Sequence, residues 1–268
     1  MTYYIIDADL APVIRNGSMD DISVLIDIMT DSGKGRVSLD GEICKLLIDA
    51  KHGSLISNDA QRIIMDELQK FGGNSILNIF RGGKGVPYHE IACDVADHLN
   101  ANYNKGQGVS LVESAILMQV IKKSMEKMSE AEKRQFFQQF GVKYDVGLGA
   151  SAMASLQIAV AAGGFASYQL SLMAANAVAR AIVGRGLALG ANSALTRGIS
   201  VFAGPIGWAL TAIWTAYDLA SPAYRVTVPC VVQIAYMRQK AQMQECPKCH
   251  SQQIAGSKFC SECGQQLP

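Results

Sequence analysis

Four cysteines near the carboxyl end of the chain have a spacing that predicts a definite chemistry. Cys246 and Cys249 form one C-x-x-C pair, and Cys260 and Cys263 form a second pair ten residues further along. Each pair can place two thiolates in one tight turn, and two such turns complete the tetrahedral four-sulfur site that zinc prefers. The metal also neutralises thiolates that would otherwise repel one another. The spacing therefore predicts a zinc ribbon over residues 246–268, in which these cysteines bind Zn²⁺.

The predicted metal site is closed, and we therefore expect it to be structural. Four thiolates fill the coordination sphere of zinc and leave no position for a catalytic water. His250 directly follows Cys249 and is the rival ligand, but we expect it to lie outside the coordination sphere because four cysteines suffice. Cys44, Cys93 and Cys230 are scattered and odd in number, which favours a reducing compartment over a disulfide framework.

One segment carries histidines that could take part in catalysis. His89 and Glu90 begin an H-E-x-x-H metalloprotease motif, but Cys93 occupies the position of the second histidine. Asp94 and His98 are four residues apart, so they can share a helix face as an ion pair or as a weak metal pair. We expect a solvated pair without a catalytic use.

Two glycine-rich segments could bind phosphate groups. Residues 81–85 could cradle a phosphate in a turn, although we expect a flexible connector there. Residues 184–190 fit a dinucleotide glycine pattern, but they follow an alanine-rich helical stretch and lack the strand and the acidic residue that such a motif needs. The chain has no Gly-x-Ser-x-Gly motif and no phosphate-binding loop that ends in Gly-Lys-Ser or Gly-Lys-Thr. We therefore predict a protein that is not an enzyme.

The elements that must position the cysteines are expected to be helices. Residues 1–145 carry apolar side chains at helical spacing, which predicts a domain of short amphipathic helices. Four residue pairs in this range have the spacing of a capping box, in which two side chains satisfy each other's free backbone amides. These pairs are Ser18 with Asp21, Asn58 with Gln61, Ser110 with Glu113, and Ser129 with Glu132.

The composition changes sharply at about residue 146. Residues 146–179 contain no charged residue over 34 positions, and residues 198–217 contain none over 20. Both runs are long enough to span a bilayer, but three arginines lie between them, which opposes the positive-inside tendency for a hairpin with cytoplasmic flanks. Three interpretations of residues 146–220 stay open: a hairpin buried in the fold, a hairpin that inserts or lies in the interface conditionally, and a hairpin that spans the membrane.

The segment 221–245 is expected to lead into the zinc ribbon. We predict a last helix that begins at Pro229 and runs toward Gln244, with residues 241–245 as a short polar tether. The predicted fold class is therefore all-α: a multi-helix domain with a Gly/Ala-rich hydrophobic helical hairpin over residues 146–220, followed by a small C-terminal zinc ribbon.

Charge and composition narrow the possible partners. The 268 residues include 24 lysines and arginines against 23 aspartates and glutamates, so we expect no nucleic-acid partner. The first residues lack the basic region and the uninterrupted apolar run of a secretory signal. We expect a cytoplasmic protein that reaches the inner membrane, at its surface or inserted, through the hydrophobic hairpin.

Four segments carry a pattern that recurs in a known family. They are Asp-Ala-Asp-Leu at residues 7–10 with the acidic helix after it, residues 67–75 continuing to 81–85, Tyr88 with the helix around Asp94, and residues 221–230 with the following helix. In these segments the chain resembles the YaaW-like family of uncharacterised bacterial proteins. The central part of that family is distantly similar to the ubiquinol-cytochrome c chaperones, which implies a helical fold and an assembly role.

The predicted ribbon resembles the short zinc ribbons appended to many bacterial membrane-associated and adaptor proteins, where the module serves as an interaction or stabilising cap. Together these features predict a non-enzymatic, conditionally membrane-associated adaptor or assembly chaperone. Its expected partners are a membrane surface or a membrane-protein client, and a protein bound through the zinc ribbon. The alternative is a membrane-perturbing, pore-forming protein whose hydrophobic hairpin inserts on a trigger.

Overall fold

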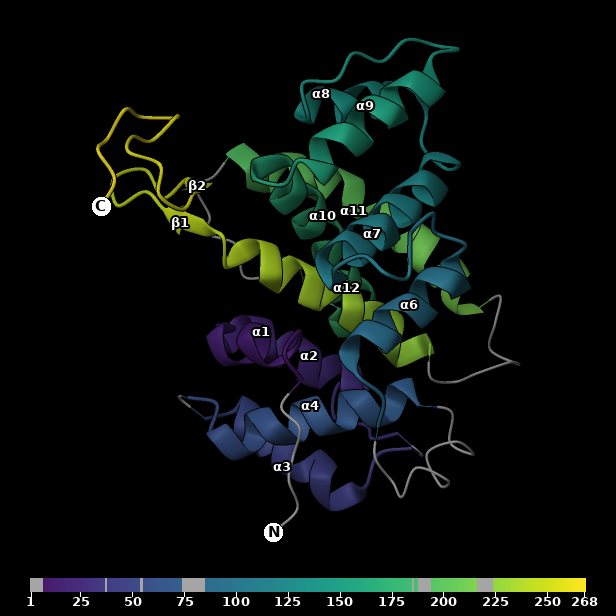
Figure 1. The fold of residues 1–268 in the computed structure, drawn as a ribbon, viewed down its shortest axis with the longest axis vertical. Coiled ribbons are helices and arrows are strands. Elements are labelled where there is room, and N and C mark those ends of the chain that lie inside the picture. The colour runs from purple at the N-terminus through teal and green to yellow at the C-terminus, as the bar shows by residue number, and fades with distance from the viewer. Residues whose placement is uncertain are drawn as a thin grey trace.

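The computed structural model describes residues 7–36, 38–53, 55–73, 85–184, 186–187, 194–215 and 224–268. These residues form a body of helices that continues into a small two-stranded ribbon, which confirms the predicted all-α class (Figure 1). The glycine-rich segments at 81–85 and 184–190 lie mostly outside the described residues.

The helices of the first 145 residues are α1 (Ala11–Asn16), α2 (Met19–Thr30), α3 (Gly41–Lys51), α4 (Asn58–Gly72), α6 (Tyr88–Leu99), α7 (Val109–Met125) and α8 (Glu130–Gln139). The helices after them are α9 (Gly149–Ala161), α10 (Phe165–Val183), α11 (Ala194–Thr215) and α12 (Tyr224–Lys240). The strands are β1 (Met243–Glu245) and β2 (Gln252–Ile254). In Figure 1, α1–α4 occupy one end of the body, α8 and α9 occupy the other, and the yellow ribbon projects from the side.

Helix α10 is the centre of the helical body. Every side chain from residue 167 to residue 179 is buried, so this stretch has no face toward solvent. It packs against α2, α7, α9, α11 and α12. A helix that is apolar or uncharged all round is expected to be buried on all sides. The structure therefore places the second part of the first charge-free run, residues 167–179, in the protein core.

Helix α12 is the second central helix and packs along α10. All side chains of residues 226–237 are buried. The helix begins at Tyr224 and ends at Lys240, so the prediction that it begins at Pro229 is wrong. Pro229 lies inside the helix. A proline often marks the first turn of a helix, but here the residues before it are buried in the core and extend the helix toward its amino end.

Helices α9 and α10 meet at a sharp elbow. The first charge-free run breaks at Gly163 and Gly164, which have φ values of +77° and +70° that favour glycine, and the two helices are bent by 106°. Among the described residues no single helix is long and apolar enough to cross a bilayer, and α9 with Phe165–Ile182 reaches that length only as this bent pair.

Of the four predicted capping boxes, one forms in full and one forms only its serine half. The Ser18 hydroxyl accepts a hydrogen bond from the backbone amide of Asp21 at the start of α2. Ser129 and Glu132 form the complete reciprocal box at the start of α8, where each side chain binds the backbone amide of the other residue. Both caps pair amides of the first helical turn that would otherwise be free.

The other two caps lie elsewhere. Asn58 is the first residue of α4 and Ser57 caps the helix, with its hydroxyl accepting from the amide of Ala60. Helix α7 begins after Gly108 without a side-chain cap, so the prediction for Ser110 is wrong. In both cases a suitable residue pair had the right spacing, but the chain entered the helix at a different residue.

A buried ion pair joins the two halves of the chain. Arg238 on α12 donates from Nε and Nη2 to the two carboxylate oxygens of Glu113 on α7, at 2.8 and 3.1 Å, and also from Nη2 to the Asp9 carbonyl at 2.8 Å. The Tyr88 hydroxyl on α6 donates to Glu113 at 2.7 Å. Burial raises the pKa of Glu113, although Arg238 and Tyr88 act against that shift. This network ties α6, α7, α12 and the N-terminal segment together.

Candidate metal centre

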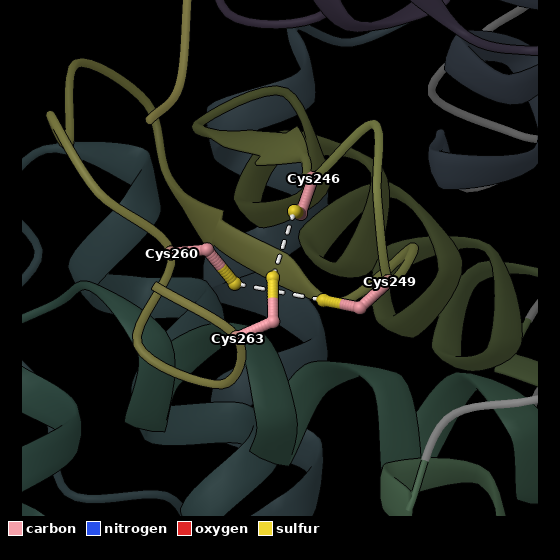
Figure 2. A group of neighbouring side chains, drawn as sticks. All are labelled: Cys246, Cys249, Cys260 and Cys263. Carbon is pink, nitrogen blue, oxygen red and sulfur yellow. Dashed lines mark hydrogen bonds between the residues drawn. The ribbon is translucent and has the colours of Figure 1, made fainter. Parts of the chain in front are cut away.

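The predicted metal ligands lie in the ribbon that follows α12 (Figure 2). After Lys240 a short turn leads into β1, which pairs antiparallel with β2, with Met243 opposite Ile254 and Glu245 opposite Gln252. The predicted polar tether at residues 241–245 is therefore mostly a strand. A paired strand holds the ribbon in a set direction relative to α12, because only the two residues between Lys240 and β1 are outside regular structure.

The structure brings the four cysteine sulfur atoms together. All four Sγ atoms lie within 4.8 Å of one another, and Figure 2 shows the side chains of both pairs converging. Sγ of Cys246 lies 3.7 Å from Sγ of Cys263, and Sγ of Cys249 lies 3.6 Å from Sγ of Cys260. A disulfide would require about 2.05 Å. Tetrahedral zinc with Zn–S bonds of about 2.3 Å requires sulfur atoms about 3.8 Å apart.

The donor set and these separations therefore fit zinc. The close contacts cross between the two C-x-x-C pairs, so each half of the ribbon would supply two of the four ligands of one metal ion. The cluster is partly sheltered: Cys246 and Cys260 are buried and the other two are half-buried. Cys246, Cys260 and Leu267 form a small hydrophobic cluster separate from the helical core. A core of this size cannot hold a fold alone, and metal binding would supply the missing stability.

The two cysteine turns have matching backbone geometry. The amide of His250 donates to the carbonyl of Cys246 at 2.9 Å, and the amide of Gly264 donates to the carbonyl of Cys260 at 3.0 Å. Both residues that follow the second cysteine of a pair are left-handed, with φ of +59° at His250 and +69° at Gly264. The turn therefore needs a residue that tolerates positive φ, and His250 fills this backbone role.

The His250 side chain points to an acidic neighbour. Its Nδ1 lies 2.6 Å from Oε1 of Glu245, and both side chains are more than half exposed. The four-sulfur cluster contains no imidazole nitrogen. This placement is the one expected for a histidine outside the coordination sphere.

One matching relative decides the family of the chain. A UPF0174 protein of Helicobacter pylori is 36% identical over 240 residues, which is 89% of this chain and 94% of the relative. The chain belongs to the UPF0174 family. A second UPF0174 protein of Helicobacter pylori is 41% identical over 184 residues, covering 67% of this chain and 88% of that relative. The UPF0174 protein YaaW of Escherichia coli is 28% identical over 239 residues, covering 88% of this chain and 95% of YaaW.

The UPF0174 relatives confirm the resemblance to the YaaW-like family. No family model matches the chain, and no solved structure matches it. The name UPF0174 specifies no ligand or reaction, so the chemistry of the metal centre rests on the geometry of the four sulfur atoms.

Three polar residues beside the cysteines were not predicted from the sequence of this UPF0174 protein. The Ser251 hydroxyl lies 3.1 Å from Sγ of Cys249 and 3.2 Å from Sγ of Cys260. The buried side chain of Gln253 links Ser251 to Ser261. Ser251 precedes β2 and follows the left-handed His250, and Gln253 lies in the strand itself, so the spacing of these residues gave no signal that their side chains would meet the cysteines.

Ser251 also affects the two thiols that it contacts. Its hydrogen bond lowers the pKa of Cys260 to about 6, with backbone amides of Glu262 and Cys263 acting in the same direction. The pKa of Cys249 is lowered as well, first by the Ser251 hydroxyl and then by the backbone of the same residue. Donors to a thiolate favour its charged form, which is the form that binds metal.

The ribbon is docked on the helical body of the UPF0174 fold. Met243 in β1 packs against the main hydrophobic core. A Cβ atom placed on Gly164 would lie 3.3 Å from Cδ1 of Ile254, so β2 lies directly over the α9–α10 elbow. Burial raises the pKa of Tyr168 on α10 to about 12, and the charges of Asp21 and Glu245 add to that shift. The ribbon therefore lies against the α9–α10 elbow.

The two histidines that were considered for catalysis, His89 and His98, lie on α6. Nε2 of His89 lies 2.9 Å from the Gln107 carbonyl, and its Nδ1 lies 3.7 Å from the Cys93 sulfur. Burial raises the pKa of the Cys93 thiol, which disfavours the thiolate that a nucleophile needs. The ring of His98 stacks on Tyr224 at 3.8 Å between centroids, and burial lowers its pKa. The structure thus places these side chains in packing contacts between α6 and its neighbours.

Proposed function

We propose that this UPF0174 protein is a non-enzymatic adaptor or assembly chaperone that binds membranes reversibly, and that a structural Zn²⁺ organises its ribbon. The observation that carries the proposal is an uncharged surface at the α9–α10 elbow, beside which the ribbon is docked. The deep burial of α10 means that residues 167–179 are not available to a partner in the folded protein, whereas this surface is.

The zinc part of the proposal rests on the donor set. Thiolate ligands select soft or borderline metals, and a tetrahedral four-sulfur site is typical of zinc or of iron–sulfur centres. The site has no open position, so the role supported by the geometry is to hold the ribbon together. Purified protein is expected to contain one zinc ion per chain by elemental analysis. Cys260→Ser with Cys263→Ser should remove that zinc, and retention of a full equivalent would contradict the site.

The elbow surface consists of Ile158 on α9, Phe165 at the start of α10 and Ile254 on the ribbon. Their exposed fractions are 72%, 40% and 48%. The outward residues of α9 beside them are alanine, serine and glutamine, without a charge. Exposed apolar residues that gather in one place mark contact sites for partners or membranes.

The size of the elbow surface predicts weak, reversible binding. Fully burying one isoleucine or phenylalanine contributes about 1.5–3 kcal/mol, so the exposed fractions of these three side chains supply roughly 2–5 kcal/mol. That range corresponds to dissociation constants of about 0.2 mM or weaker at one site. The folded protein therefore suits transient contact with a bilayer interface, and a stable anchor would need further buried surface.

Flotation with liposomes tests the proposal. The zinc-loaded protein should float partly with the vesicles, and high salt should not release it because the elbow surface is uncharged. Ile158→Glu should abolish flotation, since it places a charge in the contact. Leu55→Glu is the matched control, because Leu55 is 84% exposed on the loop between α3 and α4. Absence of flotation with every lipid composition and pH, or equal loss in both variants, would contradict the membrane contact.

One observation favours a second candidate, a pore-forming protein. Helices α9 and α10 together reach the length and composition of a membrane span as a bent pair. Insertion would require α10 to leave the core, because residues 167–179 are buried on all sides. Dye release from vesicles separates the two candidates: reversible docking leaves vesicles intact at high protein coverage, whereas insertion of α10 releases the dye.

A further inference from the structure

The hydrogen bonds around Gln253 run in one direction toward the metal centre. The backbone amide of Ser261 can only donate, and it lies 3.1 Å from the Gln253 side-chain oxygen Oε1. The Ser261 hydroxyl lies 3.0 Å from the same oxygen. These contacts fix which end of the amide faces Ser261 and thereby leave Nε2 facing the opposite way.

Nε2 of Gln253 reaches the Ser251 hydroxyl at 3.0 Å. An amide nitrogen only donates, so Oγ of Ser251 accepts this bond. The single hydroxyl hydrogen of Ser251 is then available for the sulfur atoms of Cys249 and Cys260, at 3.1 and 3.2 Å. One of these cysteines comes from each C-x-x-C pair, so the Ser251 hydroxyl lies where the two halves of the site meet.

We propose that Gln253 and Ser251 form a hydrogen-bond relay that tightens metal binding by directing a hydroxyl hydrogen at the Cys249 and Cys260 thiolates. This inference rests on the proposed metal centre and names positioning residues within it. Each member of the relay donates toward the cysteines, so the bonds polarise one another and strengthen the last one. Gln253 is buried, so its amide has little water to compete for these bonds.

The relay makes a prediction for zinc affinity. Partners that hydrogen-bond to metal ligands typically change metal affinity 10–100-fold when they are removed. Ser251→Ala removes the hydroxyl, and Gln253→Met keeps the side-chain volume but removes the amide that orients it. Both variants should lose affinity within that range, measured by competition with a chromophoric chelator at constant pH. Ser251→Thr retains a hydroxyl and should recover most of the wild-type affinity.

A double variant distinguishes a relay from two separate packing effects. If Gln253 acts through Ser251, then Ser251→Ala with Gln253→Met should be no weaker than Ser251→Ala alone. Losses that multiply in the double variant would overturn the relay. Ser257→Ala is the control within the same ribbon and should bind zinc as the wild type does.

Cobalt substitution supplies a readout that a purely structural role would not move. A hydrogen bond to a thiolate lowers the energy of its sulfur lone pairs, so its loss should shift the thiolate-to-cobalt charge-transfer band to longer wavelength in Ser251→Ala and in Gln253→Met. Unchanged spectra and affinities in variants that still bind one metal would overturn the relay while leaving the metal centre intact. A wild-type protein that binds neither zinc nor cobalt would overturn both.

Discussion

The buried pair of Glu113 and Arg238 allows a stability prediction whose size follows from its geometry. The guanidinium makes two bonds to the carboxylate, and the Glu113 side chain is 2% exposed against 17% for Arg238. Arg238→Met would leave a buried carboxylate with only the Tyr88 hydroxyl as a hydrogen-bond donor among these partners. Removing one partner of a buried pair costs about 3–5 kcal/mol. We therefore expect Arg238→Met to lower the free energy of unfolding by that amount.

Removing both charges should cost less than the two single changes added together. Glu113→Leu with Arg238→Met leaves the Tyr88 hydroxyl and the Asp9 carbonyl without these partners, at roughly 1–3 kcal/mol each, but leaves no unpaired charge. The coupling free energy from the double-variant cycle should therefore be at least about 2 kcal/mol in favour of the pair.

Urea unfolding of the zinc-saturated protein, followed by far-ultraviolet circular dichroism, measures these quantities. Lys133→Met is the matched control, because Lys133 pairs with Glu130 at the same 2.8 Å but that glutamate is 46% exposed. Such surface pairs contribute about 0–1 kcal/mol. A cost for Arg238→Met that is no larger than the control, or single costs that simply add, would refute the reasoning from burial.

Three further predictions concern other parts of the chain. Gly85→Ala should lower the free energy of unfolding by about 1–3 kcal/mol in urea, because its Cβ would overlap the backbone of Gln69; an unchanged midpoint would contradict this packing. Zinc removal with a strong chelator should abolish protection of β1 and β2 from hydrogen exchange while α10 stays protected, and parallel loss in both would contradict a separate ribbon core. Glu132→Gln should lower the melting temperature at pH 7, because hydrogen bonds from Ser129 lower the pKa of Glu132. That stabilisation is present above the unfolded-state pKa and is lost as the pH falls through the folded-state pKa, so melting curves of wild type and variant should converge in acid.

The metal ligands could be predicted because their pattern is local. Two C-x-x-C pairs ten residues apart specify which atoms converge, whatever the rest of the chain does. The polar residues around them, Ser251 and Gln253, could not be predicted in the same way. Their role depends on the side-chain amide of Gln253 meeting Ser261 across the ribbon, which residue spacing alone does not determine.

Helix starts show the same division between local and distant information. Ser129 and Glu132 were predicted as a cap and form one, since both partners lie within one turn. Glu113 has the same spacing from Ser110, but its carboxylate is held by Arg238, which lies 125 residues away in sequence. A local pattern cannot indicate that a distant cation will take the side chain.

The hydrophobic segment was ambiguous for a physical reason. Apolar helices have the same composition whether protein or lipid surrounds them, so the sequence left core and membrane interpretations open. The arrangement of α10 among five other helices places residues 167–179 in the core of the folded chain. The break at Gly163 and Gly164 was also missed, because glycine is frequent throughout this segment and does not mark its own conformation.

The central position of α10 has a consequence for how the protein is synthesised. Its neighbour α12 ends about 57 residues later, at Lys240 against Val183 for α10. At translation rates of about 5–20 residues per second, α12 is completed roughly 3–11 s after α10. Throughout that interval, the part of the apolar surface of α10 that later packs against α12 is uncovered. The nascent chain therefore passes through a stage in which an uncharged helix is open to chaperones, to other ribosome-bound copies or to a nearby bilayer. The ribbon follows α12 in the sequence, so it reaches the elbow later still.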